Sequence, residues 1–287
     1  MYEIKERQLG HIHLLDLIDN ENNTIVSFSP QRGGIITHFQ VGETEILFLD
    51  EESFLNEEMS VRGGIPILFP IAGRLTDGVY EWNQQEYSMP SHGFARDLEW
   101  KLIQTEQENH ASATIRIQSN EKTKKYYPFD FEVHYKYILK ENQLRIEQSY
   151  MNHSDEAMPT HIGFHPYFNT SEHHLQYGTD AQVFFNDRDY EKQAVNGSID
   201  LTNKTCSYFL AEAKTPEINF TLPEVNKTVR MTYGEEFKYI VLWTEPEAPF
   251  ICVEPWTAMP DALNHHNDLC MIPPHKQLQT HFTIAID

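Results

Sequence analysis

Hydrophobic and polar residues alternate with a period of two along most of the chain, which is the pattern of β-strands that have one buried face. The clearest case is a predicted hairpin whose two strands run from Phe131 to Leu139 and from Leu144 to Tyr150. Similar alternation marks three further segments: Ala113 to Ser119, Lys227 to Thr232 and His281 to Ile286. Helical periodicity is rare, and the best helix signal lies around Glu51 to Met59. The pattern predicts an all-β protein with few short helices.

Two segments are apolar throughout, Tyr239 to Trp243 and Phe250 to Val253. A short run of this kind is typical of a strand that is buried on both faces. Alternating strands at near-regular spacing, with polar turns between them, predict one large antiparallel β-sandwich. We see no linker, so residues 1–287 are expected to form a single domain. The polar stretch from Asn186 to Asn203 is expected to be a rim loop that holds one strand.

The composition disfavours several classes of partner. The chain carries 43 acidic and 22 basic residues, a formal net charge of −21, which repels nucleic acid and anionic membrane surfaces. It lacks an apolar stretch near the roughly 18 residues that span a bilayer, and its first residues lack the apolar core of a signal peptide. The three cysteines have no C-x-x-C spacing, and an odd count suits a reducing compartment. We expect a cytoplasmic protein that binds neither nucleic acid nor membranes.

Two apolar segments far apart in the sequence each contain one ionisable side chain. His165 lies within the run from Ile162 to Phe168, and Glu254 follows the run from Phe250 to Val253. Burial raises the pKa of a carboxyl group unless a partner opposes it, and a raised pKa suits a general base. An imidazole titrates near neutral pH and is a natural acid partner. Each residue alone would be an ordinary hydrogen-bonded core group, but together they predict proton transfer on an uncharged substrate.

A second candidate region combines glycines, prolines and arginines. Gly63, Gly64 and two prolines interrupt an apolar stretch, which implies an irregular backbone in close contact with its surroundings. Three arginines flank this region: Arg62, Arg74 and Arg96. Guanidinium groups suit either vicinal sugar hydroxyls or a phosphate, and ordinary surface arginines are the alternative. The chain has neither a G-x-G-x-x-G nor a Walker pattern, so the sequence gives no support to nucleotide binding.

Four blocks of the sequence stand out when taken in order: Arg62-Gly-Gly-Ile-Pro with Phe69-Pro70, Ala72-Gly73-Arg74, His92-Gly93-Phe94-Ala95-Arg96, and His165-Pro166-Tyr167-Phe168 with Glu254-Pro255-Trp256. In this order they resemble the aldose 1-epimerases, also called galactose mutarotases, and within them the bacterial branch related to hexose-6-phosphate mutarotases. The resemblance covers most of the chain. It implies a galactose mutarotase-like supersandwich, with the sugar cleft on its concave face and no cofactor.

The resemblance also implies how the pair works. Glu254 would take the proton from the anomeric O1 hydroxyl while His165 protonates the ring oxygen O5. The C1–O5 bond then opens, and rotation about C1–C2 followed by reclosure gives the other anomer. General acid and base contributions of about 10² to 10⁴ each, with orientation of the sugar, suffice without a metal or a covalent intermediate.

The same family pattern supplies candidate sugar ligands. His92 and Arg74 match its sugar-binding His and Arg, and the rings of Phe168 and Trp256 are expected to stack on the pyranose. An acidic sugar ligand between the catalytic His and Glu has two candidates, Asp187 and Asp180.

The substrate is a small sugar, either a free aldohexose or a hexose 6-phosphate. In the second case Arg62, Arg74 and Arg96 would hold the phosphate. A monomer and a homodimer are equally compatible with the sequence.

Other classes of function fit less well. A non-catalytic sugar-binding module on the same fold need not keep both His165 and Glu254. A helical zinc motif would use the spacing of His161 and His165, but Pro159, Gly163 and Pro166 argue against a helix, so we expect no metal. A glycosidase needs a second carboxylate across the scissile bond, and Glu254 has no obvious mate.

Overall fold

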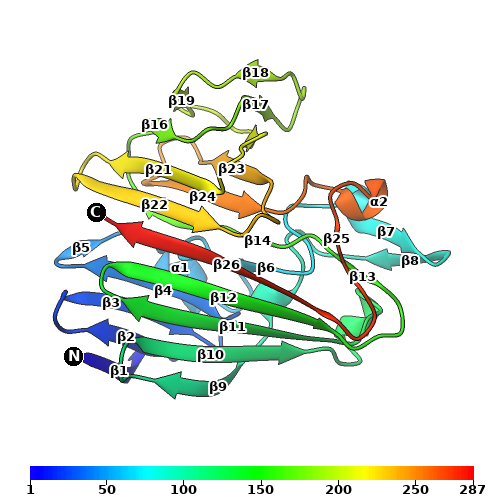
Figure 1. The fold of residues 1–287 in the computed structure, drawn as a ribbon, viewed down its shortest axis with the longest axis horizontal. Helices are drawn as coiled ribbons and strands as arrows, with labels where there is room; N and C mark the ends of the chain where they lie inside the picture. Colours follow the sequence, from blue (N-terminus) through cyan, green and yellow to red (C-terminus); the bar gives the residue numbers. More distant parts are fainter.

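Antiparallel β-strands make up most of the computed structural model, which describes residues 1–287 (Figure 1). One layer is a nine-stranded sheet. Its strands, in spatial order, are β19 (Ser198–Asp200), β16 (His174–Gly178), β21 (Glu217–Leu222), β22 (Lys227–Tyr233), β26 (Gln277–Ile286), β12 (Gln143–Asn152), β11 (Phe131–Lys140), β10 (Ala111–Gln118) and β9 (Lys101–Glu106). β26 is the last strand in chain order, yet it lies between β22 and β12 in the interior of the sheet.

Two sheets pack against the buried face of this layer. The first has five strands: β1 (Tyr2–Leu9), β2 (Ile12–Asp19), β3 (Thr24–Ser29), β4 (Ile35–Val41) and β5 (Thr44–Glu45). The second has eight strands, in the order β18 (Gln193–Ala194), β17 (Val183–Asn186), β20 (Tyr208–Ala211), β23 (Tyr239–Trp243), β24 (Phe250–Trp256), β14 (Gly163–Phe164) and β6 (Ile67–Leu68), with β15 (Tyr167–Asn169) also paired to β24. The predicted antiparallel sandwich is therefore confirmed.

The remaining elements are short. Two two-stranded sheets stand apart from the large sheets: the hairpin of β7 (Val79–Trp82) with β8 (Gln85–Ser88), and the long-range pair of β13 (Met158–Thr160) with β25 (Cys270–Ile272). The helices are α1 (Glu51–Leu55), α2 (Ala262–His265) and the 3₁₀ turns η1 (Thr76–Gly78), η2 (Ala95–Asp97) and η3 (Thr123–Lys125). None of these helices has the length and apolar character that a membrane crossing requires.

The core lies between the layers and is rich in aromatic rings. The hairpin of β11 and β12 has the predicted alternation, and the inward residues of β11 are all buried. On β11, Tyr137 meets Phe28 of the five-stranded sheet, with ring centroids 5.0 Å apart. On β26, Phe282 meets Phe164 of the eight-stranded sheet at 4.9 Å. Because both contacts involve the inner face of the nine-stranded sheet, that one face anchors both opposing sheets.

Two local predictions differ from the structure. The first helix ends at Leu55 rather than near Met59. The guanidinium of the buried Arg32 donates to the backbone carbonyls of Ser53, Phe54, Asn56 and Met59, so a tertiary contact occupies carbonyls that a longer helix would use itself. The stretch from Asn186 to Asn203 holds two short strands, β18 and β19, rather than one.

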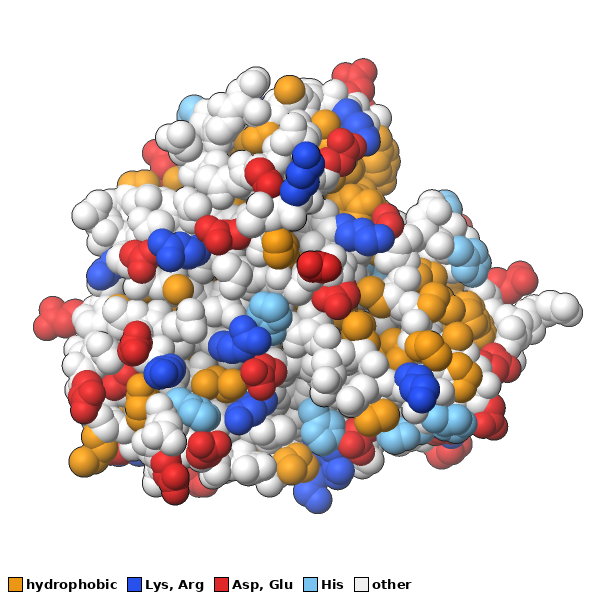
Figure 2. All heavy atoms as spheres, in the orientation of Figure 1, with side chains coloured by type: hydrophobic (Ala, Val, Ile, Leu, Met, Phe, Trp, Pro, Cys, Tyr) orange, Lys and Arg blue, Asp and Glu red, His pale blue; other side chains and the backbone are white.

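The surface that faces the viewer in Figure 2 mixes acidic and basic side chains over the nine-stranded sheet. Hydrophobic side chains gather below the upper lobe, which carries β17 and β18, and around α2 at the right. The outline of the molecule is notched between these two regions.

Candidate active site

The two faces of β24 have different surroundings, and this difference presents Glu254 to a cavity. Side chains alternate across a strand. Ile251 and Val253 belong to the main core between the layers, whereas Cys252 and Trp256 belong to smaller clusters on the opposite face. Glu254 shares that opposite face and is only 1% exposed. The strand thus holds a carboxyl group at the closed end of a pocket.

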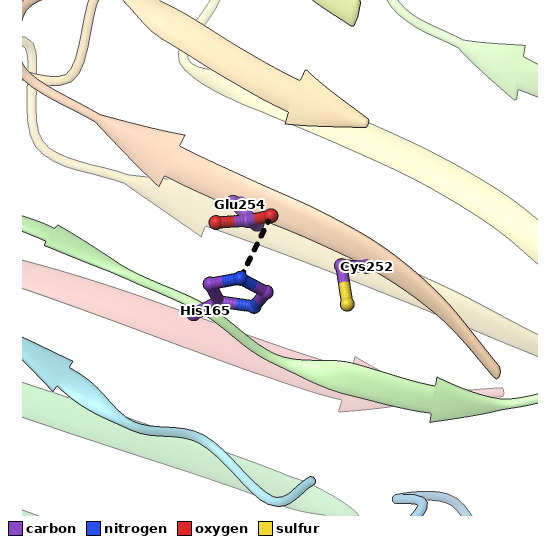
Figure 3. Close-up of side chains that lie close together, drawn as sticks. All are labelled: His165, Cys252 and Glu254. Carbon is purple, nitrogen blue, oxygen red and sulfur yellow. Dashed lines mark ion pairs between the residues drawn. The ribbon is translucent and has the colours of Figure 1, made fainter. Parts of the chain in front are cut away.

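His165 faces Glu254 from the segment between β14 and β15 (Figure 3). Its Nε2 lies 3.4 Å from Glu254 Oε1. The imidazole stacks on the ring of Tyr167, with centroids 4.7 Å apart and an interplanar angle of 11°. The indole Nε1 of Trp256 donates a hydrogen bond to Glu254 Oε2 at 3.1 Å. One carboxyl oxygen is therefore held by the indole, and the other faces the imidazole.

Burial disfavours the charged form of both groups. It raises the pKa of Glu254 well above the ordinary carboxyl value, and the hydrogen bond from Trp256 opposes this only in part. It lowers the pKa of His165 well below the ordinary imidazole value, and the nearby His92 and Arg96 add to the effect. Between these two pKa values the pair holds one proton. One proton shared by two groups supplies an acid and a base in the same site.

The pair opens into a cavity of about 450 Å³, within the usual size range of small-molecule sites. The structure brings eight of the nine predicted site residues to its walls: Arg62, Arg74, His92, Arg96, His165, Asp187, Glu254 and Trp256. Three aromatic side chains that the sequence reasoning missed also line it: Tyr167, Phe209 and Trp243. The distant blocks of the sequence therefore converge on one site.

Phe168 is the predicted site residue that does not reach the cavity. Its ring is fully buried in the main core, where it packs on Phe220 with centroids 5.0 Å apart. His165 and Tyr167 share one face of the extended chain, and Phe168 lies on the other. A ring with no exposed surface cannot stack on a sugar, so this placement contradicts the expected role. The period of two, counted from His165, would have selected Tyr167.

His92 acts as a hydrogen-bond donor toward the cavity. Its Nδ1 accepts a hydrogen bond from the backbone N–H of Gly73 at 3.0 Å. Burial lowers the pKa of His92 to about 3, so the ring is neutral and carries its proton on Nε2. The ring lies 5.4 Å from the ring of His165 and 5.8 Å from that of Trp256, measured between centroids. A fixed N–H donor beside the pair suits a sugar oxygen.

The three arginines of the cavity differ in their protein contacts. Arg62 forms an ion pair with Glu245 at 2.9 Å and lies 5.4 Å from the ring centroid of Trp243. Arg96 donates from Nη2 to the carbonyl of Ser91 at 2.9 Å, and its buried Nε has no partner in the protein. The side chain of Arg74 is exposed and makes no hydrogen bond or ion pair within the protein. Arg74 and Arg96 thus retain donors for a ligand.

The structure separates the two candidates for the acidic sugar ligand. Asp187 lines the cavity and accepts a hydrogen bond from the N–H of Ser207 at 3.3 Å. Asp180 lies outside the cavity, where it accepts from the N–H and the hydroxyl of Thr215 at 3.0 and 2.9 Å. Only Asp187 can contact a ligand beside the pair.

The paired glycines have the close contacts that the sequence predicts. A Cβ on Gly63 would lie 2.5 Å from the Cα of Leu49, and a Cβ on Gly64 would lie 2.2 Å from the carbonyl oxygen of Ile36. Both glycines have positive φ angles, which side chains rarely adopt. The glycines therefore fix the path of the chain next to Arg62.

One set of side chains has donor atoms close enough to consider a metal ion. The ligand atoms of His165, Cys252 and Glu254 all lie within 4.8 Å of one another (Figure 3). Burial raises the pKa of the Cys252 thiol well above its ordinary value, so the thiol stays protonated. A protonated thiol is a poor ligand. A metal ion would have to displace this proton in order to bind all three side chains, whereas proton exchange uses the groups as they are.

Comparison with known proteins gives matches over nearly the whole length of the chain. A family model described as aldose 1-epimerase matches residues 16–285. The Slr1438 protein of Synechocystis sp. PCC 6803 is 31% identical in a structural alignment that covers 100% of this chain and 99% of that one, with a TM-score of 0.93. Galactose 1-epimerase from Lactobacillus acidophilus NCFM shares the fold at 14% identity, with 100% and 98% coverage and a TM-score of 0.74.

One relative has a name that refers to a phosphorylated sugar. A Salmonella typhimurium protein provisionally named glucose-6-phosphate 1-epimerase is 30% identical over 171 residues, which are 59% of this chain and 52% of that protein. The chain thus matches about half the length of that relative.

Proposed function

Because the chain belongs to the aldose 1-epimerase family, we propose that it interconverts the α and β anomers of an aldohexose, with Glu254 and His165 exchanging the protons. The observation that carries the proposal is the buried pair, with Nε2 and Oε1 3.4 Å apart at the closed end of a sugar-sized cavity. Aromatic and hydrogen-bonding side chains surround the pair, as a polyhydroxylated ring requires.

Ring opening needs one proton removed and one proton added. Glu254 takes the proton of the O1 hydroxyl, and His165 gives a proton to the ring oxygen O5 as the C1–O5 bond breaks. The product is the open-chain aldehyde, whose C1–C2 bond rotates. On reclosure His165 takes the proton of the O5 hydroxyl, and Glu254 returns a proton to the carbonyl oxygen. The enzyme ends with the protons it had at the start.

The proton on the pair must lie on His165 when opening begins. Burial favours the uncharged arrangement, in which Glu254 carries it. A bound sugar shifts this balance, since its O1 hydroxyl donates to the carboxylate and its O5 accepts from the imidazolium. The charged arrangement is therefore assembled with substrate, where each proton transfer contributes about 10² to 10⁴ in rate.

The other walls of the cavity are proposed to hold the pyranose. The indole of Trp256 and the ring of Tyr167 offer flat apolar surfaces to the C–H face of the sugar. His92 donates to a ring or hydroxyl oxygen, and Asp187 accepts from a hydroxyl. Arg74 has free donors for hydroxyls at the exposed side of the cavity. Fixed orientation of the sugar supplies the remaining rate enhancement.

A hexose 6-phosphate is the second candidate substrate, and Arg96 favours it. Its buried Nε lacks a partner in the protein, and Arg62 and Arg74 line the same cavity. A phosphate would satisfy these donors. The Salmonella typhimurium relative, by its provisional name, acts on such a sugar. Against this, the net charge of −21 opposes a dianion at long range, so we place the free aldohexose first.

Polarimetry tests the proposal directly. Freshly dissolved α-D-galactose and α-D-glucose are followed with wild type, Glu254→Gln and His165→Asn, and hexose 6-phosphates by NMR exchange spectroscopy. We expect wild type to accelerate mutarotation and each variant to lose about 10² to 10⁴ of kcat. The preferred substrate is the one with the highest kcat/KM.

A matched control separates chemistry from folding. Glu45 is a half-buried carboxyl group outside the cavity, and burial raises its pKa as well. The folded fraction of Glu45→Gln should therefore keep the full kcat of wild type. If wild type binds a sugar but does not accelerate its mutarotation, the proposed enzyme activity is overturned. The protein would then be a carbohydrate-binding protein on the same fold.

We further propose that the protein works in the cytoplasm as one domain, either as a monomer or as a homodimer. All three cysteines are free, which supports a reducing compartment. Light scattering of the purified protein determines the number of subunits.

A further inference from the structure

One face of the Tyr167 ring lies flat against the imidazole of His165. The ring centroids are 4.7 Å apart and the two planes meet at 11°. Tyr167 is 4% exposed and His165 is 9% exposed, so the contact is largely shielded from water. The π electrons make the face of an aromatic ring negative, and they attract a cation most strongly where water is excluded. The contact therefore favours the imidazolium form of His165 over the neutral form.

Most charged groups near His165 oppose a positive charge on it. His92, Arg96 and Arg62 all add to the effect of burial, which lowers the pKa of His165. Glu254 faces Nε2 at 3.4 Å, but burial raises its pKa, so in the uncharged arrangement Glu254 keeps the shared proton. The charged arrangement of the pair thus needs support from a group that is neither a cation nor the proton acceptor itself.

The other contacts of the imidazole do not provide this support. Its Nδ1 is buried and has no hydrogen-bond partner in the protein. The nearby Cys252 thiol is neutral, because burial keeps it protonated (Figure 3). Trp243 contacts the imidazole at 5.7 Å between centroids, but the planes meet at 82°, and Arg62 lies 5.4 Å from the Trp243 ring centroid. Tyr167 is the ring that lays its face on the imidazole.

The fold fixes Tyr167 in this position. Its backbone N–H donates to the carbonyl of Gly64 at 2.9 Å, and its carbonyl accepts from the N–H of Phe48 at 3.0 Å. Its ring packs on Phe250, with centroids 4.9 Å apart and planes at 65°. Burial raises the pKa of the Tyr167 phenol well above its ordinary value, so the ring stays neutral. Tyr167 therefore acts on His165 through its face and not as a phenolate counter-ion.

From this geometry we propose that Tyr167 is a positioning residue, whose ring face stabilises the imidazolium of His165 and keeps Nε2 directed at Glu254. The inference rests on the proposed function, because ring opening there begins with the proton on His165. Tyr167 offsets part of the effect of burial on this state before substrate binds. This role acts on kcat, whereas stacking of the same ring on the sugar would act on sugar binding.

Fluorination tests the ring face without removing the side chain. Phenylalanine and its mono-, di- and trifluorinated analogues are placed at position 167, since each fluorine withdraws π electron density and changes the ring size little. We expect Tyr167→Phe to keep kcat within about threefold, and the trifluorinated ring to lower kcat by about 10-fold to 30-fold in steps along the series. Sugar affinity, measured by calorimetry, should stay within about twofold. The same series at Phe250 is the matched control, because Phe250 packs on Tyr167 but lies outside the cavity.

An NMR titration measures the contact independently of turnover. The imidazole nitrogens are labelled with ¹⁵N, and the signal of His165 is assigned by its loss in His165→Asn. We expect the pKa of His165 to fall in steps along the fluorinated series, because the imidazolium loses its stabilisation. The acid limb of the pH–rate profile should move to lower pH in the same steps.

The outcomes separate this inference from the proposed function. A pKa of His165 that falls along the series supports the stabilising contact, even if no sugar is turned over and the epimerase proposal fails. An active enzyme whose kcat and His165 pKa stay constant along the series overturns the inference alone. Weaker sugar binding at an unchanged kcat would make Tyr167 a platform for the sugar and would also overturn the inference.

Discussion

Trp256 and Glu254 lie two residues apart on one face of β24, and the indole Nε1 donates to Oε2 of the carboxyl group at 3.1 Å. This hydrogen bond lowers the pKa of Glu254 against the larger effect of burial. A strand makes such a pair possible because residues i and i+2 project in the same direction. The aromatic ring that lines the cavity therefore also tunes the proposed base.

Trp256→Phe should keep the ring and lose the hydrogen bond. Because a bond to a charged group is worth about 1.5 to 3 kcal/mol, we expect kcat to fall about tenfold or more. The pKa of Glu254 should rise further. Because the pair loses its one remaining proton at this pKa, the alkaline limb of the pH–rate profile should move to higher pH. Trp82→Phe is the control, since the buried Nε1 of Trp82 has no partner and lies outside the cavity. An unshifted alkaline limb in Trp256→Phe would show that the bond does not tune the base.

Gly73→Ala should disturb the site through the same indole. A Cβ on Gly73 would lie 3.0 Å from the ring of Trp256, and the φ of +79° already strains any side chain. Gly42 has a similar φ of +62° with no atom within 4 Å of an added Cβ, so Gly42→Ala reproduces the strain without the clash. We expect the two variants to lose similar stability in urea and only Gly73→Ala to lose activity. Equal activities would mean that Trp256 moves aside without consequence.

The strands were predictable from the sequence because burial is periodic in it. The alternation from Phe131 to Leu139 fixed both the hairpin and its inward face, and the apolar run at Phe250 identified the central strand β24. The short helix was not predictable to its end, since its last turn depends on the distant Arg32. The local sequence pattern determines which strands and helices form, and tertiary contacts determine the residues at which they end.

The site was predictable where chemistry marked it. Two ionisable groups in apolar strands pointed to His165 and Glu254, which the structure brings together. Trp243 and Phe209 could not be found this way, because an aromatic residue on a buried strand looks the same whether it faces the core or a cavity. The choice of Phe168 was avoidable, because the period of two counted from His165 selects Tyr167 instead. Which strands border the cavity follows from sheet order, and sheet order is not local in the sequence.

The buried His161 should make the protein sensitive to acid. Burial lowers the pKa of His161 to about 3, whereas the unfolded chain takes up this proton near the ordinary value of 6.5. As the pH falls from 6.5 toward 3, the unfolded state binds a proton that the native state does not. The free energy of unfolding should then decrease by about 1.4 kcal/mol per pH unit from this residue alone.

Urea unfolding at a series of pH values measures that slope. His161→Asn should flatten the acid side of the stability curve by one proton's contribution, and the exposed His13→Asn should leave it unchanged. Identical slopes for wild type and His161→Asn would exclude this residue as a cause of acid sensitivity.

Chelation should leave the reaction intact. The donor atoms of His165, Cys252 and Glu254 are close together, but the protonated Cys252 thiol is a poor ligand and the proposed chemistry needs only protons. We expect dialysis against a strong chelator to leave kcat unchanged, with less than one metal ion per chain by mass spectrometry. Activity lost on chelation and restored by zinc alone would place a metal in the site.

The interior position of β26 has a consequence for synthesis on the ribosome. Until the residues from Gln277 onward emerge, β22 and β12 have no partner between them, and the nine-stranded sheet exists only as two separate halves. Each half then exposes a strand edge, which is a template for pairing with other nascent chains. Since the inner face of this sheet anchors both opposing sheets, the nascent protein stays open to aggregation until β26 inserts.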